Sequence, residues 1–137
     1  QFFVRDGVGI RVWQRAGYKF GILTARTSHI VEIRAAELGI EIVRQGVEDK
    51  RTALTEMLAQ QQLEPRQVAF LGDDLPDIAA AKSVGLAVAP ADACAEMREA
   101  AHYVTNAPGG RGAVRETIEW ILKSQDRWND LLRKFNG

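Results

Sequence analysis

Residues 68–81, VAFLGDDLPDIAAA, decide the fold, because an apolar run passes here into an alanine-rich one through a turn with three carboxylates. The run VAFLG predicts a buried strand, and a proline in the next turn predicts the start of a short helix over 76–83. A strand that feeds directly into a helix is typical of α/β proteins. Asp73, Asp74 and Asp77 repel one another at this junction, so their crowding is costly unless a cation lies among them.

The same alternation of strand-like and helix-like segments runs along the rest of the chain. Strands are predicted at 18–24, 40–46, 67–72, 85–90 and 102–107, and helices at 7–17, 28–39, 49–62, 76–83, 91–101 and 112–135. Ser28 and Asp49 are predicted N-caps. Repeated strand and helix units predict an α/β, Rossmann-like three-layer fold, in which helices cover both faces of a parallel sheet. No linker interrupts the pattern, so residues 1–137 are predicted to form a single domain.

Composition sets limits on function. The chain has 137 residues, 46% of them hydrophobic and 26% charged, with 18 basic and 18 acidic side chains. This balance gives no reason to expect a nucleic acid or membrane partner, so any charge-based function must be local. The single cysteine, Cys94, excludes an internal disulfide, and no bilayer-spanning segment or signal peptide is recognisable, which together predict a cytoplasmic protein. The start, QFFV, lacks an initiator Met and fits a fragment as well as a complete chain.

Polar residues follow three of the predicted strands, where ligands bind in parallel sheets. Thr24 ends the first strand and its hydroxyl suits a phosphate oxygen, while Lys50 follows the second and could neutralise phosphate charge. The aspartates after the third strand offer the oxygen ligands that Mg²⁺ prefers. Each feature alone has a plain alternative. Thr24 fits an ordinary turn threonine, Lys50 a solvated lysine, and the aspartates a helix N-cap cluster. Their combination favours a phosphate and Mg²⁺ site.

These motifs resemble a known family. ILTAR, QGVEDK and GDDLPD are similar to the second, third and fourth motifs of the haloacid dehalogenase-like phosphohydrolases. The blocks FFVRDGVGIRVWQRAG, RAAELGI, GLAVAPADA and GGRGAVRE resemble the capless 3-deoxy-D-manno-octulosonate 8-phosphate phosphatases in order and spacing. The resemblance covers nearly the whole chain. It implies a Mg²⁺-dependent phosphomonoesterase that acts on a sugar acid phosphate in lipopolysaccharide precursor synthesis, and a homotetramer.

The resemblance also implies residue roles. Asp73 is the expected Mg²⁺ ligand, with Asp74 and Asp77 in support, while Thr24 binds the phosphoryl group and Lys50 pairs with it and with the nucleophile. The positions that match substrate contacts are Phe3, Val4, Arg5, Asp6, Gly7, Arg11, Arg26, Arg34 and Lys50. Arginine suits both the carboxylate and the phosphate of such a substrate, although Arg11 and Arg34 also fit exposed charges on helix faces. Arg111 and Arg115 fit either a place near the site or ordinary turn and helix-start roles.

The family's first motif, an aspartate pair spaced by one residue, has no match ahead of VRDG. The first aspartate attacks phosphorus and the second acts as acid and then base. The resemblance places the strand that carries them between the strands of Thr24 and Asp73, so its absence should leave two strand edges unpaired and the core divided. Roughly forty to fifty upstream residues would supply it. Phe3 and Ala25 also depart from the family pattern, which has a polar residue and a glycine there.

Three other readings remain. A pseudo-enzyme or phosphate-ligand-binding subunit would bind without turnover, and a nonulosonate 9-phosphate phosphatase would use the same chemistry on another sugar acid. A phosphorylated receiver domain also gathers aspartates, a hydroxyl and a lysine at strand ends. In that class the acidic pair comes first and the lysine last, whereas Thr24 and Lys50 precede Asp73 here. The motif order therefore disfavours the receiver reading.

Overall fold

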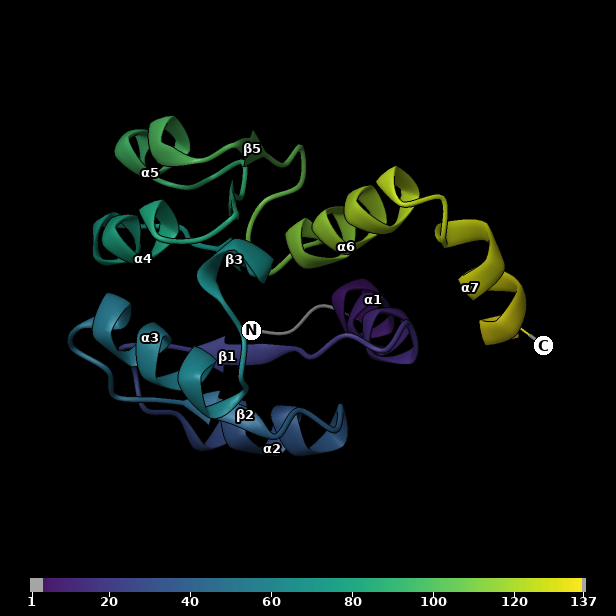
Figure 1. Ribbon diagram of the computed structural model, residues 1–137, viewed down its shortest axis with the longest axis horizontal. Coiled ribbons are helices and arrows are strands. Elements are labelled where there is room, and N and C mark those ends of the chain that lie inside the picture. The colour runs from purple at the N-terminus through teal and green to yellow at the C-terminus, as the bar shows by residue number, and fades with distance from the viewer. Residues whose placement is uncertain (1–3, 137) are drawn as a thin grey trace.

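Short parallel strands lie between helices in the computed structural model of the chain, which describes residues 4–136 (Figure 1). The strands are β1 (Gly21–Leu23), β2 (Ile42–Arg44), β3 (Ala69–Leu71), β4 (Leu86–Ala89) and β5 (Tyr103–Val104). The α-helices are α1 (Val4–Arg15), α2 (His29–Glu37), α3 (Lys50–Gln60), α4 (Ile78–Lys82), α5 (Ala95–Ala100), α6 (Ala113–Ser124) and α7 (Trp128–Asn136), and two short 3₁₀ helices are η1 (Pro65–Gln67) and η2 (Leu75–Asp77). No helix within residues 4–136 is long and apolar enough to cross a bilayer.

The strands form two parallel sheets. In the smaller, β1 pairs with β2, with Gly21 opposite Ile42. In the larger, β4 lies between β3 and β5, with Ala69 opposite Leu86 and Val88 opposite Tyr103. The predicted α/β class with parallel strands is confirmed. Within the described residues β1 and β3 are edge strands, which agrees with the break expected between the strands that precede Thr24 and Asp73.

The buried side chains form two clusters that follow the division of the sheets. One cluster lies around β4 and is built by side chains from α3, α4 and α5, with Ala80, Ala87 and Met97 wholly buried. The other joins α1, α2, α6 and α7, with Ile10 and Leu122 at its centre. Figure 1 shows α1, α6 and α7 grouped at one side of the molecule and α4 and α5 at the other.

The helix starts follow the predicted capping residues, but only one cap forms as expected. Asp49 precedes α3 and its carboxylate accepts the Thr52 N–H at 3.1 Å. Ser28 precedes α2, yet its side chain caps nothing, and its own N–H donates to Gln45 Oε1 at 2.8 Å. The second helix is therefore fixed at its start by the chain after β2 rather than by a local cap.

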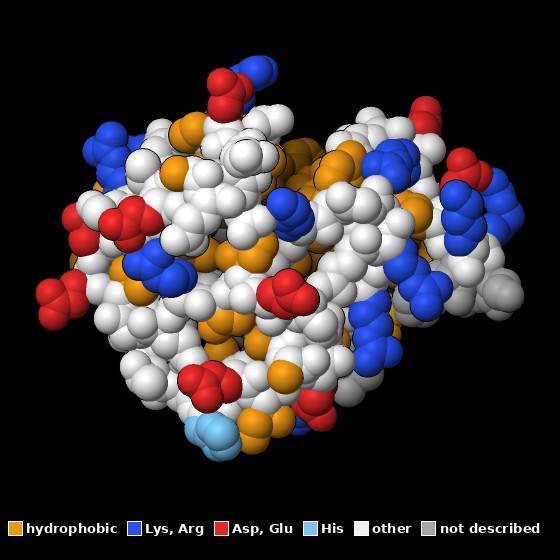
Figure 2. Space-filling view, turned by 60° about the horizontal axis from the view of Figure 1, so that its bottom comes forward, with side chains coloured by type: hydrophobic (Ala, Val, Ile, Leu, Met, Phe, Trp, Pro, Cys, Tyr) orange, Lys and Arg blue, Asp and Glu red, His pale blue; other side chains and the backbone are white. Residues whose placement is uncertain are grey.

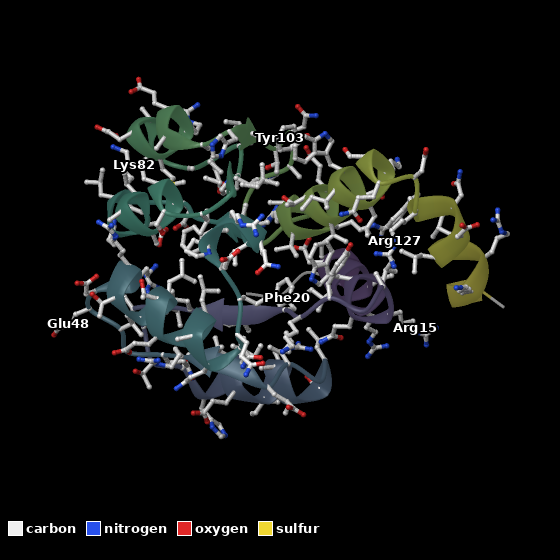
Figure 3. All side chains as sticks on the ribbon, in the orientation of Figure 1. Arg15, Phe20, Glu48, Lys82, Tyr103 and Arg127 are labelled. Atoms are coloured by element: carbon white, nitrogen blue, oxygen red, sulfur yellow. The ribbon has the colours of Figure 1, made fainter. Side chains whose placement is uncertain are left out.

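The single helix predicted over 112–135 is wrong, because the chain breaks into α6 and α7. Asp126 has a left-handed φ of 58° and turns the chain. The Arg127 guanidinium then donates to the carbonyl of Ala16 at 2.8 Å, and Figure 3 shows Arg127 between α6 and α1. An unbroken helix would rotate Trp128 by roughly a third of a turn from the face of Leu122. The turn lets both side chains enter the same core.

Candidate active site

The residues predicted at the strand ends meet in one cavity. Thr24, Lys50, Asp73 and Asp77 line a space of about 450 Å³ at the carboxyl ends of β1 and β3. The rest of its described lining is Leu23, Leu71, Gly72, Pro90, Gly109, Gly110 and Arg111. The parallel strands explain the meeting, since their carboxyl ends face the same edge. The site thus lies between the two sheets.

Thr24 is fixed by the continuation of strand pairing past β1. Its N–H donates to the carbonyl of Arg44 at 3.0 Å, and its carbonyl accepts the Val47 N–H at 3.2 Å. Its hydroxyl oxygen accepts the Arg26 N–H at 3.2 Å. A hydroxyl also carries one proton of its own, so Thr24 can still donate to a ligand oxygen.

Lys50 and Asp77 form a shielded ion pair at the floor of the site. Lys50 Nζ lies 2.5 Å from Asp77 Oδ1, and their side chains are only 13% and 4% exposed. The other Asp77 oxygen accepts the N–H groups of Asp73 and Asp74 at 2.9 and 3.2 Å. Burial acts to raise the pKa of Asp77, but the Lys50 ammonium and the two N–H donors outweigh it and lower that pKa. Asp77 therefore holds Lys50 and the turn in place.

Asp73 and Asp74 stand in different environments, although they are neighbours in sequence. Burial raises the pKa of Asp73, and contact with Asp77 adds to the effect. Both side chains are exposed, but Asp74 Oδ1 accepts the Leu75 N–H at 2.8 Å and caps η2, whereas Asp73 lines the cavity. Asp73 is thus the carboxylate at this cavity whose charge is least compensated, a position that a bound cation would relieve.

Gly72 explains how the turn folds so tightly over Asp77. A Cβ at Gly72 would lie 2.6 Å from Asp77 Cβ and 2.9 Å from an aromatic carbon of Phe70. Both distances are below any real contact, so only glycine fits between β3 and the aspartates.

The other substrate positions implied by the resemblance are spread over the structure. Phe3 lies outside the described residues, and Val4 and Arg5 begin α1. Arg26 is exposed in the turn after Thr24. Arg11 lines a separate groove of about 500 Å³ against the end of α2. These roles stay predictions.

Three further predicted positions lie away from the cavity lining. Arg34 is exposed on α2 and lies 3.5 Å from Glu37. Gly7 and Asp6 belong to the first turns of α1, and Asp6 is 3% exposed. Its two oxygens accept the N–H groups of Gly112 and Arg115 at 3.2 and 2.9 Å. The structure therefore connects Asp6 to the start of α6.

Arg111 is a cavity residue for which the sequence left the role open. It lies in the glycine-rich segment between β5 and α6 and lines the cavity beside Gly109 and Gly110. Within residues 4–136, no three His, Cys, Asp or Glu side chains gather closely enough to hold a metal ion. The described carboxylates would form one side of a cation site.

Comparison with known proteins agrees with this geometry. The family model described as haloacid dehalogenase-like hydrolase matches residues 22–115. The chain belongs to this family. The resemblance noted from its motifs is confirmed at this level, and the match spans the segment from β1 to the start of α6.

Individual relatives narrow the similarity. The chain is 48% identical over 126 residues to the 3-deoxy-D-manno-octulosonate 8-phosphate phosphatase KdsC of Yersinia pestis. The matched stretch covers 92% of this chain and 67% of that protein. The crystal structure of that phosphatase from Yersinia pestis superposes with a TM-score of 0.91 at 47% identity, covering 93% of this chain and 69% of that one. The crystal structure of the Moraxella catarrhalis phosphatase, in complex with a magnesium ion, a phosphate ion and a KDO molecule, superposes with a TM-score of 0.94 at 38% identity. The match covers 98% of this chain and 77% of that one.

Proposed function

We propose that this chain carries most of the active site of a Mg²⁺-dependent phosphomonoesterase that hydrolyses 3-deoxy-D-manno-octulosonate 8-phosphate to the free sugar acid and phosphate. The observation that carries the proposal is the cavity shared by Thr24, Lys50 and Asp73. A hydroxyl, an ammonium and a carboxylate at one sheet edge suit a phosphoryl group and its cation. The names of the Yersinia and Moraxella relatives support this substrate. The reaction would serve lipopolysaccharide precursor synthesis.

Thr24 and Lys50 would hold the transferring phosphoryl group. The Thr24 hydroxyl can donate its proton to one phosphoryl oxygen, because the Arg26 N–H uses only a lone pair of the hydroxyl oxygen and leaves the O–H free. The Lys50 ammonium has three N–H groups and donates one hydrogen bond to Asp77, so two N–H groups remain for the phosphoryl group and the nucleophile. The low exposure of the pair excludes water and strengthens these contacts.

Asp73 would be the Mg²⁺ ligand from this chain, with Asp74 and Asp77 in support. The fit rests on the cavity position of Asp73 and on its raised pKa, which burial and then Asp77 cause. Asp77 would act mainly by fixing the turn, because its oxygens already accept from Lys50 and from Asp73 and Asp74. Bound Mg²⁺ would neutralise charge on the phosphoryl oxygens during transfer.

The nucleophile would come from a strand outside the residues described, placed between β1 and β3. Support comes from the open edges of these two strands, which carry Thr24 and Asp73 at their ends. One aspartate of that strand would attack phosphorus, and the second would protonate the departing sugar oxygen. Water would then attack the phosphorus of the aspartyl phosphate, while the second aspartate takes a proton from that water. This step would release phosphate and restore the first aspartate.

Phosphate release by the complete gene product, from a panel of sugar acid phosphates, tests the proposal. We expect turnover of the octulosonate 8-phosphate, loss of turnover on chelation of Mg²⁺, and loss in Asp73→Asn with the circular dichroism spectrum unchanged. No turnover with Mg²⁺ present would favour the pseudo-enzyme reading. Preference for a nonulosonate 9-phosphate would change the substrate and leave the mechanism in place. Unchanged turnover in Asp73→Asn would refute the site.

The remaining substrate-contact residues and the assembly are part of the same proposal. The contacts carried over from the resemblance are Phe3, Val4, Arg5, Asp6, Gly7, Arg11, Arg26 and Arg34. A homotetramer in the cytoplasm is also proposed, and light scattering on the complete protein measures the subunit number. Both acidic and basic side chains are spread over the face shown in Figure 2, with hydrophobic atoms exposed between them.

A further inference from the structure

We propose that Arg111 binds an anionic group of the substrate at the mouth of the cavity, and that buried Asp6 positions it by fixing the segment 107–112. The inference rests on the proposed function, because it concerns the same cavity. It gives Arg111 a direct role in recognition. It also gives Asp6 an indirect role, through the backbone at the start of α6.

Arg111 is placed and charged for this role. Of the cavity lining within residues 4–136 it is the only arginine, and its side chain is exposed. The other cation there, Lys50, already donates to Asp77. Among the described residues, the Arg111 guanidinium has no carboxylate within ion-pair distance. A planar guanidinium with five N–H donors matches a carboxylate or a phosphate group through paired hydrogen bonds.

The backbone around Arg111 is held at both ends by carboxylates. Asp92 Oδ1 accepts the Gly109 N–H at 2.8 Å, two residues before Arg111. Asp6 Oδ2 accepts the Gly112 N–H at 3.2 Å, one residue after it. Gly112 has a left-handed φ of 114°, which a side chain would disfavour. The segment therefore has a defined path, and the path sets where the guanidinium can reach.

Asp6 has the properties of a positioning residue. It is 3% exposed, and burial of a carboxylate is costly unless its oxygens accept hydrogen bonds. Both do so: Oδ2 from Gly112 and Oδ1 from the Arg115 N–H at 2.9 Å, in the first turn of α6. The N-terminal end of a helix also favours a negative charge. Since both side-chain oxygens already accept hydrogen bonds and the side chain is buried, the Asp6 carboxylate acts on a ligand through the segment it holds, and the direct substrate contact proposed above falls to the Asp6 backbone.

The carboxylate and the phosphate of the substrate are two sources of the anion, and competitive inhibitors separate them. In the complete protein, Arg111→Gln should raise KM for the octulosonate 8-phosphate about tenfold, with kcat changed by less than about twofold. If Arg111 binds the carboxylate, the inhibition constant of the free sugar acid rises. If it binds the phosphate, that of inorganic phosphate rises. Arg98→Gln, an exposed arginine on α5, is the matched control and should change none of these. If neither inhibitor weakens and KM is unchanged, the role of Arg111 is refuted.

A double-mutant cycle tests the positioning role of Asp6. Asp6→Asn keeps the size of the side chain but replaces one acceptor oxygen with a donor, so one N–H loses its partner. KM should rise about three- to tenfold in the parent protein and show no further rise in the Arg111→Gln background. An equal rise in both backgrounds would refute coupling through Arg111.

A milder variant keeps the test decisive if Asp6→Asn fails to fold. Asp92→Ala removes an exposed carboxylate whose hydrogen bond among the described residues is the one from the Gly109 N–H, so the fold should persist. It should raise KM in the same direction by a smaller factor, again without effect in the Arg111→Gln background. Failure of the cycle with an active parent protein refutes only this inference. An inactive parent protein refutes the proposed function itself.

Discussion

Strand β4 and the two strands that carry the site differ in how completely they are built into the protein. β4 pairs on both sides, and its last three residues are buried. β1 and β3 pair on one side only, and each begins with an exposed residue. The described structure is thus complete around β4 and open where Thr24 and Asp73 stand. Across this opening the two sheets are joined by the buried Lys50–Asp77 pair and by apolar side chains of α3, which pack in the core around β4.

The Lys50 and Asp77 pair is the least exposed ion pair among the described residues, and breaking it should have the largest effect. Lys50 begins α3, which follows β2 of the smaller sheet. Asp77 ends η2, which follows β3 of the larger sheet. Asp77→Ala would leave a buried ammonium and two backbone N–H groups without an acceptor, so we expect a loss of about 3 kcal/mol or more in unfolding free energy. Phosphate release should also fall to background. Urea denaturation and turnover assays on the complete protein measure both.

Asp74→Ala is the control, because Asp74 is an exposed neighbour whose carboxylate only caps the start of η2. It should cost no more than about 1 kcal/mol. Equal losses in the two variants would mean that the buried pair contributes nothing beyond a helix cap.

The two cores should respond to cavity formation with similar total losses. Met97 and Leu122 are each 0% exposed, one in the core around β4 and the other beside α1. Replacement of either by alanine should destabilise the protein by about 3 kcal/mol through lost packing. Thermal or chemical unfolding gives the value. A single transition in both variants would show that the two cores unfold together, whereas two transitions in one of them would show independent unfolding.

Much of the fold was predictable because its signals are local. Apolar periodicity and flanking polar residues place the strands and most helices within a few residues, and parallel strand ends bring Thr24, Lys50 and Asp73 together. The break between α6 and α7 was missed, because it depends on Arg127 reaching the carbonyl of Ala16, 111 residues away. Helix propensity alone favours continuing through 125–127.

The site, like the fold, was predictable only where its signals are local in sequence. Each residue found from its motif directly follows a strand or begins the next helix. The block GGRGAVRE left the role of Arg111 open, and the contact of Asp6 with Gly112 could not be read from a motif, because the two residues are 106 positions apart. Such contacts are set by how α1 packs on α6, and a pattern within one element carries no information on that packing.

Stability should depend on pH through Glu116 of α6, whose carboxylate accepts the hydroxyl of Tyr103 in β5. Burial acts to raise the pKa of Glu116, but the Asn106 N–H, the Tyr103 hydroxyl at 2.7 Å and the Ala107 N–H outweigh it and lower that pKa. A carboxyl whose folded pKa is below its unfolded value stabilises the fold above the unfolded value and stops doing so as the pH falls through the folded one. Unfolding free energy should therefore decrease with acidification below the ordinary value of 4.5.

Glu116→Gln tests the source of that slope. Urea midpoints measured from neutral to acidic pH should vary less in this variant than in the parent protein. Glu99→Gln, an exposed position on α5, is the control and should keep the parent slope. Equal slopes in all three proteins would assign the acid sensitivity to other carboxyls.

The smallest effect on stability is expected at Arg34, on the outer face of α2 beside the smaller sheet. Its pair with Glu37 is more than half exposed on both sides, and exposed pairs of this kind contribute less than about 0.5 kcal/mol. Arg34→Gln should therefore leave the urea midpoint unchanged, which makes KM a clean measure of the substrate role that the family resemblance implies. A rise in KM would support that role and, since Arg34 is not in the described lining of the cavity, would point to a contact from a second copy of the chain. An unchanged KM would leave Arg34 as a solvated charge on a helix face.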